Sequence, residues 1–214
     1  PECTGIANLP PRAHLHSFEN EAKALDGNPE HSAYYQPLDG NWKFRLFPKP
    51  AVLEAEVISQ SLNDSSWESI EVPGNWTMQG HDRPHYTNVQ MPFPDQPPNI
   101  PEDNPTGVYR THFHLPESWD QRRILIHFGG VESAFFVFCN GKRVGFAKDS
   151  RTAVEFDLTP MVQKGMNQIS VVVIRWSDGS HLEDQDHWWM AGIHRGVYLR
   201  STCLLYTSPS PRDA

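Results

Sequence analysis

Short apolar runs that alternate with polar residues recur along most of the chain. Trp42, Phe44 and Leu46 alternate with Lys43 and Arg45, which is the period of a strand with one buried face. Other strand-like runs are bounded by turn residues and lie at 67–72, 109–115, 124–128, 135–139, 144–146, 153–158, 169–176 and 197–199. The pattern predicts about eight to ten short strands and almost no helix.

Helix signals are few. Residues 16–25 predict one short helix, with Ser17 as its N-cap and Gly27 just beyond its end. Residues 159–164 predict a single helical turn. Residues 52–64 fit either a loop or a broken helix, because their apolar positions follow neither period clearly.

One long stretch lies outside the strand pattern. Residues 74–107 form a segment rich in proline, and a loop of this length within a compact domain is usually functional or disordered. Trp76, Tyr86 and Phe93 are embedded in it, and large aromatic side chains indicate an ordered loop that docks on another surface.

The strand pattern predicts an all-β fold. Asn140-Gly141 between two apolar runs predicts a tight hairpin, because a type I′ turn needs positive φ at both positions. Short strands separated by turns favour a β-sandwich, and eight strands in two sheets make a jelly roll. We expect one β domain over residues 38–201, preceded by an irregular N-terminal segment over 1–37.

Composition narrows the classes of partner. The chain has 214 residues and a formal net charge of -8, so the basic patch that nucleic acid or an anionic membrane would require is not expected. No apolar run approaches the roughly 20 residues of a membrane-spanning helix, and no signal-peptide pattern is present. Three cysteines exclude a disulfide scaffold and fit a reducing compartment, so the expected location is cytoplasmic.

The last residues read differently from the rest. Residues 203–213, C-L-L-Y-T-S-P-S-P-R-D, match the translation of a transposase sequencing adaptor codon for codon. We therefore expect residues 202–214 to be adaptor read-through and exclude them from the reasoning about the fold. A natural Ser/Pro-rich tail is the alternative.

Carboxylates and indoles crowd the segment from 176 to 199. A sugar presents hydroxyls, which need polar partners, and a C–H face, which needs an apolar plane; such sites combine a few polar groups with aromatic ones. Trp188 or Trp189 would supply the plane. The carboxylates available for the hydroxyls are Asp178, Glu183, Asp184 and Asp186. The segment therefore predicts a carbohydrate site.

Other interpretations compete with this one. In the first alternative, the acids form a solvated turn and the tryptophans belong to the core, because charge runs are usually exposed and large aromatic side chains are usually buried. His181 and His187 add metal-binding side chains, but their spacing matches neither zinc pairs nor the calcium loop. Two carboxylates about 5 Å apart would cleave a glycoside with retention, although neighbouring loop acids seldom face each other. The sequence has no nucleophile elbow, P-loop or dinucleotide-binding glycine pattern.

Four ordered blocks carry a family resemblance. They read L-D-G-N-W-K-F at 38–44, V-P-G-N-W-x-M-x-G-x-D-x-P-x-Y-T-N-V at 72–89, C-N-G-K-x-V-G-F-x-x-D-S-R at 139–151, and D-G-S-x-L-E-D-Q-D-x-W at 178–188 followed by M-A-G-I-x-R-x-V-x-L. Together they resemble the N-terminal sugar-binding domain of the large lac-type β-galactosidases of glycoside hydrolase family 2. The resemblance implies a galactose-binding-like jelly-roll β-sandwich with long ordered loops.

The resemblance also implies site residues. Asn88 and Asp186 match the two positions of this domain that contact substrate, and Asp186 also matches a sodium ligand. Asp178 matches an aspartate associated with a magnesium site in some members. Without the resemblance, Asn88 is a turn residue and Asp186 a capping residue. The family's catalytic glutamates come from a later barrel, so no catalytic residue is expected in this chain.

The function implied is that of an N-terminal fragment of a retaining β-galactosidase, which hydrolyses terminal non-reducing β-D-galactose in substrates such as lactose. The fragment alone is expected to be inactive. The partners implied are a β-galactoside, the C-terminal catalytic barrel of the same chain and further copies in a homo-oligomer, with sodium and magnesium ions as cofactors. The alternatives are a non-catalytic carbohydrate-binding module or another family 2 activity.

Overall fold

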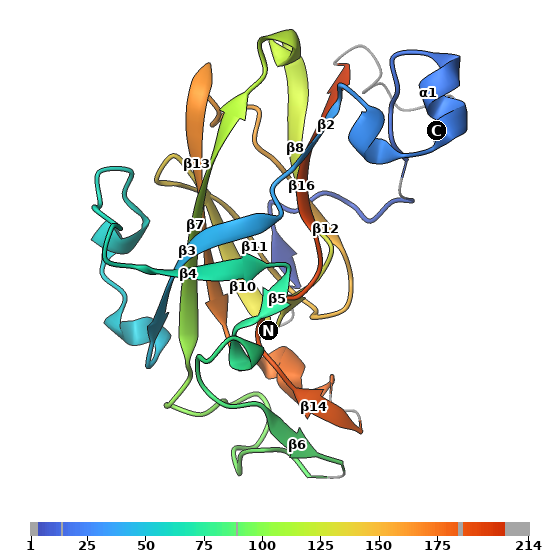
Figure 1. Cartoon of the computed structure of the whole chain (residues 1–214). Coiled ribbons are helices and arrows are strands. Elements are labelled where there is room, and N and C mark those ends of the chain that lie inside the picture. The colour runs from blue at the N-terminus through green and yellow to red at the C-terminus, as the bar shows by residue number, and fades with distance from the viewer. Residues whose placement is uncertain (1–3, 14, 89, 184–185, 204–214) are drawn as a thin grey trace.

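Two antiparallel sheets form the body of the molecule (Figure 1). The computed structural model describes residues 4–13, 15–88, 90–183 and 186–203. The seven-stranded sheet runs in the order β1 (Gly5–Ile6), β11 (Lys142–Lys148), β10 (Ala134–Cys139), β13 (Gly165–Ile174), β7 (Thr106–Leu115), β3 (Gly40–Phe47), β4 (Glu68–Val72). The four-stranded sheet runs in the order β12 (Val154–Asp157), β8 (Arg122–Phe128), β16 (Val197–Cys203), β2 (Tyr35–Pro37).

The core lies between these sheets. Phe135 of β10 lies 5.1 Å from Phe128 of β8 and 6.1 Å from Phe156 of β12, measured between ring centroids, so aromatic side chains join the two layers. In β13 alternate residues such as Val171 and Val173 enter the same core, as a pleated strand requires. The molecule is therefore a β-sandwich.

Shorter elements decorate the sandwich. A three-stranded sheet has the order β5 (Gly74–Asn75), β15 (Gly192–Ile193), β9 (Val131–Glu132), and a two-stranded ribbon joins β14 (His187–Trp189) to β6 (His85–Thr87). The described helices are α1 (Glu21–Asp26) and the single 3₁₀ turns η1 (Pro29–His31), η2 (Pro50–Val52), η3 (Ala55–Ile58), η4 (Trp76–Met78), η5 (Glu117–Trp119) and η6 (Asp178–His181). No helix in the described ranges is both long and apolar enough to cross a membrane.

The longer strands of the two large sheets agree with the alternation in the sequence, whereas the short strands β1, β2, β5, β6, β9, β14 and β15 were not predicted. The helix ends do not all agree. The hairpin is confirmed, with φ of 52° at Asn140 and 75° at Gly141. Ser17 was the wrong N-cap: α1 begins at Glu21, because the Asn20 side chain accepts a hydrogen bond from the Lys23 N–H. The single turn predicted at 159–164 is present as a hydrogen-bonded turn, in which the Val162 N–H donates to the Leu158 carbonyl over 3.0 Å.

Both ends of the described chain add residues to the large sheets. Within 1–37, β1 pairs with β11 and β2 pairs with β16, so this segment adds an edge strand to each large sheet. At the other end, β16 continues through Thr202 and Cys203, which lie opposite Arg123 and Arg122. The remainder of the predicted read-through, 204–214, lies outside the described residues.

Replacing Phe156 tests whether the core lies between the two large sheets. The Phe156→Ala exchange should lower the free energy of unfolding by about 3–5 kcal/mol, because it leaves a cavity between the sheets at a fully buried ring. Leu25→Ala is the control: Leu25 is 81% exposed and should change that free energy by less than about 0.5 kcal/mol. Urea denaturation measures both, and equal losses would contradict the proposed core.

Candidate carbohydrate site

The two predicted substrate residues flank the ribbon of β6 and β14: Asn88 directly follows β6, and Asp186 directly precedes β14. His187 lies opposite Thr87, and Trp188 lies opposite Tyr86. Extending this register by one residue places Asp186 across from Asn88. Because side chains alternate between the faces of a strand, the same register gives one face of the ribbon to four side chains. These are Tyr86, Asn88, Asp186 and Trp188, and all four are exposed.

An aromatic cluster holds the other face of the ribbon. Trp189 is 3% exposed, its ring lies 5.5 Å from that of Trp176, and Phe93 packs edge-on against Trp176 at 5.2 Å. The Trp189 indole N–H donates to Thr87 Oγ1 over 2.8 Å, which ties β14 to β6. Of the two tryptophans that the sequence offered as a sugar platform, Trp189 is therefore part of the packing.

The base of this cluster is fixed to the sandwich. Asn104 exchanges two hydrogen bonds with the backbone of Trp176, at 2.8 and 2.9 Å. Arg175, whose side chain is 1% exposed, forms an ion pair with Asp82 and donates to the Arg83 carbonyl over 2.7 Å. The proline-rich segment is thus an ordered arm, as its aromatic content predicted.

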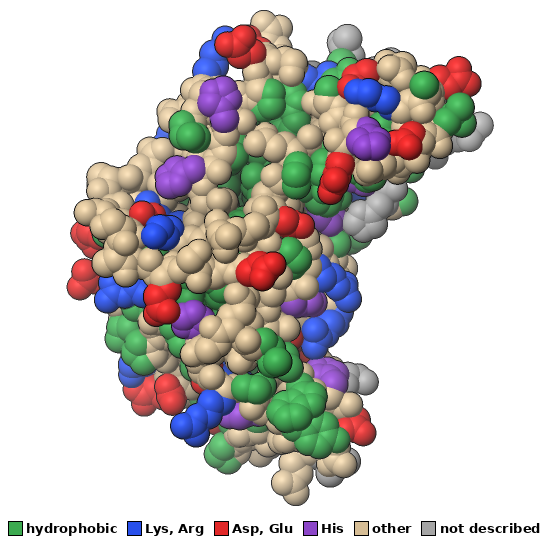
Figure 2. Space-filling model, in the orientation of Figure 1, with side chains coloured by type: hydrophobic (Ala, Val, Ile, Leu, Met, Phe, Trp, Pro, Cys, Tyr) green, Lys and Arg blue, Asp and Glu red, His purple; other side chains and the backbone are tan. Residues whose placement is uncertain are grey.

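The exposed face of the ribbon combines a carboxylate with two rings. Trp188 and Tyr86 are each 53% exposed, and their ring centroids are 5.5 Å apart. The Tyr86 hydroxyl donates to Asp186 Oδ1 over 2.6 Å, and this carboxylate raises the pKa of Tyr86 above its ordinary value. Apolar side chains gather at the end of the molecule where β6 and β14 lie (Figure 2). The face can offer an apolar plane and hydroxyl acceptors side by side.

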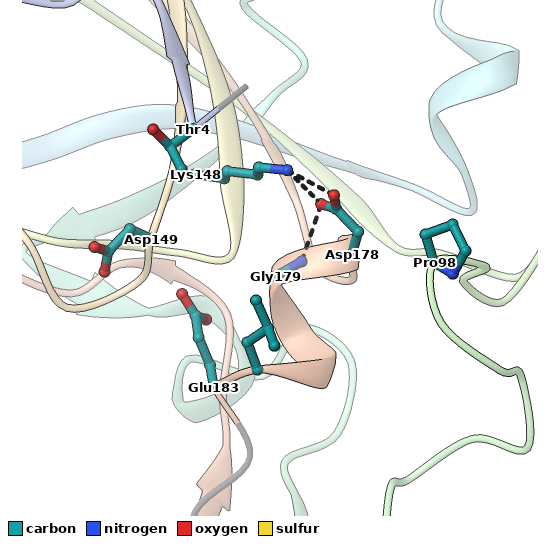
Figure 3. Close-up of a pocket in the computed structure, with 8 residues that line it drawn as sticks. Thr4, Pro98, Lys148, Asp149, Asp178, Gly179 and Glu183 are labelled. Carbon is teal, nitrogen blue, oxygen red and sulfur yellow. Dashed lines mark hydrogen bonds and ion pairs between the residues drawn. The ribbon is translucent and has the colours of Figure 1, made fainter. Parts of the chain in front are cut away.

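The other acids of the loop serve different partners. Glu183 accepts hydrogen bonds from the Ser150 N–H at 2.7 Å and from Ser150 Oγ at 2.5 Å. Asp178 accepts two bonds from the Lys148 ammonium, at 2.6 and 2.7 Å (Figure 3). Both acids therefore fasten the loop to the end of β11. Asp184, the remaining acid, lies outside the described residues.

The two residues predicted to bind metal ions, Asp186 and Asp178, have different surroundings. Asp186 offers exposed carboxylate oxygens beside the position of the Asn88 amide, and hard oxygen donors of this kind fit a sodium ion. Asp178 does not fit magnesium, because the Lys148 ammonium already engages both of its oxygens. No group of three acid, histidine or cysteine side chains suited to a metal occurs in the part of the chain that the structure describes.

Two residues of the site were missed in the sequence. Tyr86 lies two positions before Asn88, and strand alternation would have placed both on one face had the ribbon been recognised. Lys148 lies 30 positions from Asp178, so no local pattern joins them.

The predicted strand that ends at Cys139 is β10. Cys139 is fully buried there, and burial raises the pKa of its thiol to about 12.

A β-sandwich that exposes aromatic rings beside a carboxylate can offer a sugar both an apolar plane and a hydrogen-bond acceptor. The comparison with protein families agrees: the model described as "Glycosyl hydrolases family 2, sugar binding domain" matches residues 35–203. The chain belongs to this family.

Relatives and solved structures extend the comparison. The β-galactosidase of Psychromonas ingrahamii is 50% identical over 193 residues, and the match covers 90% of this chain and 18% of that protein. The β-galactosidase of Vibrio cholerae is 50% identical over 192 residues, with 88% and 18% covered. The chain thus spans about a fifth of the length of these relatives.

Two crystal structures share the fold. A β-glycosidase from Bacteroides vulgatus matches with a TM-score of 0.57 and 28% identity, over 78% of this chain and 20% of that one. The β-glucuronidase of Bacteroides uniformis matches with a TM-score of 0.61 and 23% identity, over 79% and 18%.

The contact between Tyr86 and Asp186 has a titration signature. We expect Asp186→Asn to lower the pKa of Tyr86 towards the ordinary value of 10.0, because the neighbouring negative charge that disfavours phenolate is gone. Because the pKa of Tyr86 is higher in the folded than in the unfolded chain, its contact with Asp186 stabilises the fold fully at pH values below the unfolded-state pKa. That stabilisation is lost as the pH rises through the folded-state pKa. Phenolate absorbance, with Tyr86→Phe identifying the signal, measures the shift. An unchanged pKa would show that the two groups do not interact.

Proposed function

We propose that this chain is the sugar-binding domain of a retaining β-galactosidase, which hydrolyses terminal non-reducing β-D-galactose residues. The observation that carries the proposal is the 50% identity to β-galactosidases over 90% of the chain. The exposed positions of Asn88 and Asp186, next to the paired residues of the ribbon, support it. In this account the sandwich is a jelly roll, and the catalytic glutamates are supplied by a barrel further along the same polypeptide.

Each exposed group of the ribbon has a role in this proposal. Asp186 accepts hydrogen bonds from sugar hydroxyls and places negative charge near the oxocarbenium-like transition state. The Asn88 amide adds one donor group and one acceptor, and Trp188 covers the C–H face of the sugar. Tyr86 holds the Asp186 carboxylate in place through its hydroxyl. Cleavage itself needs an acid and a nucleophile about 5 Å apart, which the barrel provides.

Asp186 would hold a sodium ion through a carboxylate oxygen, as the family resemblance implies. When bound, the ion would supply a fixed positive charge that orients sugar hydroxyls. We further propose that the complete enzyme is a cytoplasmic homo-oligomer that has no nucleic-acid or membrane partner.

A non-catalytic carbohydrate-binding module is the second candidate, because the exposed Tyr86 and Trp188 rings form an apolar plane within this chain. The two candidates differ in what the barrel contributes. A module binds galactosides tightly by itself, whereas the enzyme account expects very weak binding by the 214-residue chain. Titration calorimetry with methyl β-D-galactoside separates them.

Asp186→Asn in the complete enzyme should lower kcat/KM by about 10²–10³-fold, because it removes a negative charge from the transition-state surroundings. Asp120→Asn is the matched control: it removes the same charge from an exposed carboxylate just before β8, outside the ribbon, and should leave kcat/KM within about twofold. Cleavage of a chromogenic β-galactoside measures both. An unchanged kcat/KM for Asp186→Asn would contradict the assignment.

A further inference from the structure

Lys148 and Asp178 form a charge pair at the start of the segment that leads to the ribbon. Lys148 ends β11 and Asp178 begins η6, and the ammonium lies 2.6 and 2.7 Å from the two carboxylate oxygens. The Lys148 side chain is only 14% exposed. The same carboxylate accepts from the Gly179 N–H over 3.0 Å, and these contacts hold the pKa of Asp178 below its ordinary value, the lysine contact most strongly.

The pair lines a pocket in which each lining carboxylate accepts hydrogen bonds from protein groups. The pocket measures about 560 Å³ and also contains Asp149 and Glu183 (Figure 3). Glu183 is held by Ser150, and Asp149 Oδ1 accepts from the N–H groups of Arg151 and Thr152, each at 3.1 Å. All three carboxylates of the pocket therefore already serve protein donors.

Charge and distance both oppose magnesium at this position. Mg²⁺ binds carboxylate oxygens at about 2.0–2.1 Å and keeps several waters, so it cannot approach Asp178 while an ammonium touches both oxygens. Moving Lys148 away would break both charge-assisted hydrogen bonds to Asp178 and expose a largely buried side chain. The resemblance associates Asp178 with magnesium, and the geometry of this chain disagrees.

We propose that the Lys148 ammonium takes the place of a divalent cation at Asp178, so that this chain needs no magnesium there. The lysine neutralises Asp178 and joins η6 to the end of β11. Together with the Ser150–Glu183 contact, it fastens the segment that leads to Asp186. The proposal concerns the loop and holds whatever sugar the ribbon binds.

Mn²⁺ binding to the unmodified 214-residue chain and to its Asp178→Asn variant tests the proposal. Free Mn²⁺, a spectroscopic substitute for Mg²⁺, gives a six-line electron paramagnetic resonance signal that weakens when the ion is bound. We expect no loss of signal that depends on Asp178. A loss that the Asp178→Asn exchange abolishes and that excess Mg²⁺ reverses would overturn the proposal; a loss that persists in Asp178→Asn arises elsewhere and leaves it standing.

A thermal double-mutant cycle tests the pair itself. Lys148→Met and Asp178→Asn should each lower the Tm by about 2–4 °C, and the double variant should lie within about 1 °C of the less stable single variant, because both exchanges remove one interaction. The Tm of the unmodified chain should be equal in EDTA and in MgCl₂ at matched ionic strength. Additive losses, or a rise in Tm with Mg²⁺ that Asp178→Asn removes, would contradict the proposal.

Discussion

The register between β6 and β14 is the constraint on which the candidate site depends. Each strand has only three residues, and a slip of one residue would exchange its two faces. Trp189 prevents such a slip, because its ring is packed against Trp176 and its indole N–H is bonded to Thr87. With Trp189 fixed inward, Trp188 and Asp186 must point outward. Burial of one indole thus determines which groups a sugar can reach.

The acids of the loop divide into two roles. Asp178 and Glu183 are bonded to Lys148 and Ser150, so they fix the path of the chain between β13 and β14. Asp186 is bonded to the neighbouring Tyr86 and stays exposed. Asp178, Glu183 and Asp186 therefore do not form the pair of carboxylates that a retaining glycosidase needs. Asp178 and Glu183 are structural, and Asp186 is available to a ligand.

The sandwich could be predicted from the sequence because alternation reports a buried face directly, as in β3 and β7. The ribbon could not, because β6 lies in a proline-rich arm and both its strands are held by tertiary aromatic contacts rather than by local preference. Asn88 and Asp186 were selected by family resemblance, and their roles stay predictions. The contact of Lys148 with Asp178 joins residues far apart in the chain, so composition and spacing carried no sign of it. Ser17 failed as a helix cap because Asn20, three residues later, makes the competing hydrogen bond.

Chemical-shift mapping of the 214-residue chain tests most directly whether the ribbon is a galactoside-binding surface. Titration with methyl β-D-galactoside to high millimolar concentration should move the Asn88 side-chain amide and the Trp188 indole N–H signals, while the 4-epimer, methyl β-D-glucoside, moves them less. The buried Trp189 indole signal should stay in place. Galactoside-dependent shifts confined to other surfaces, with Asn88 and Trp188 unaffected, would contradict the account.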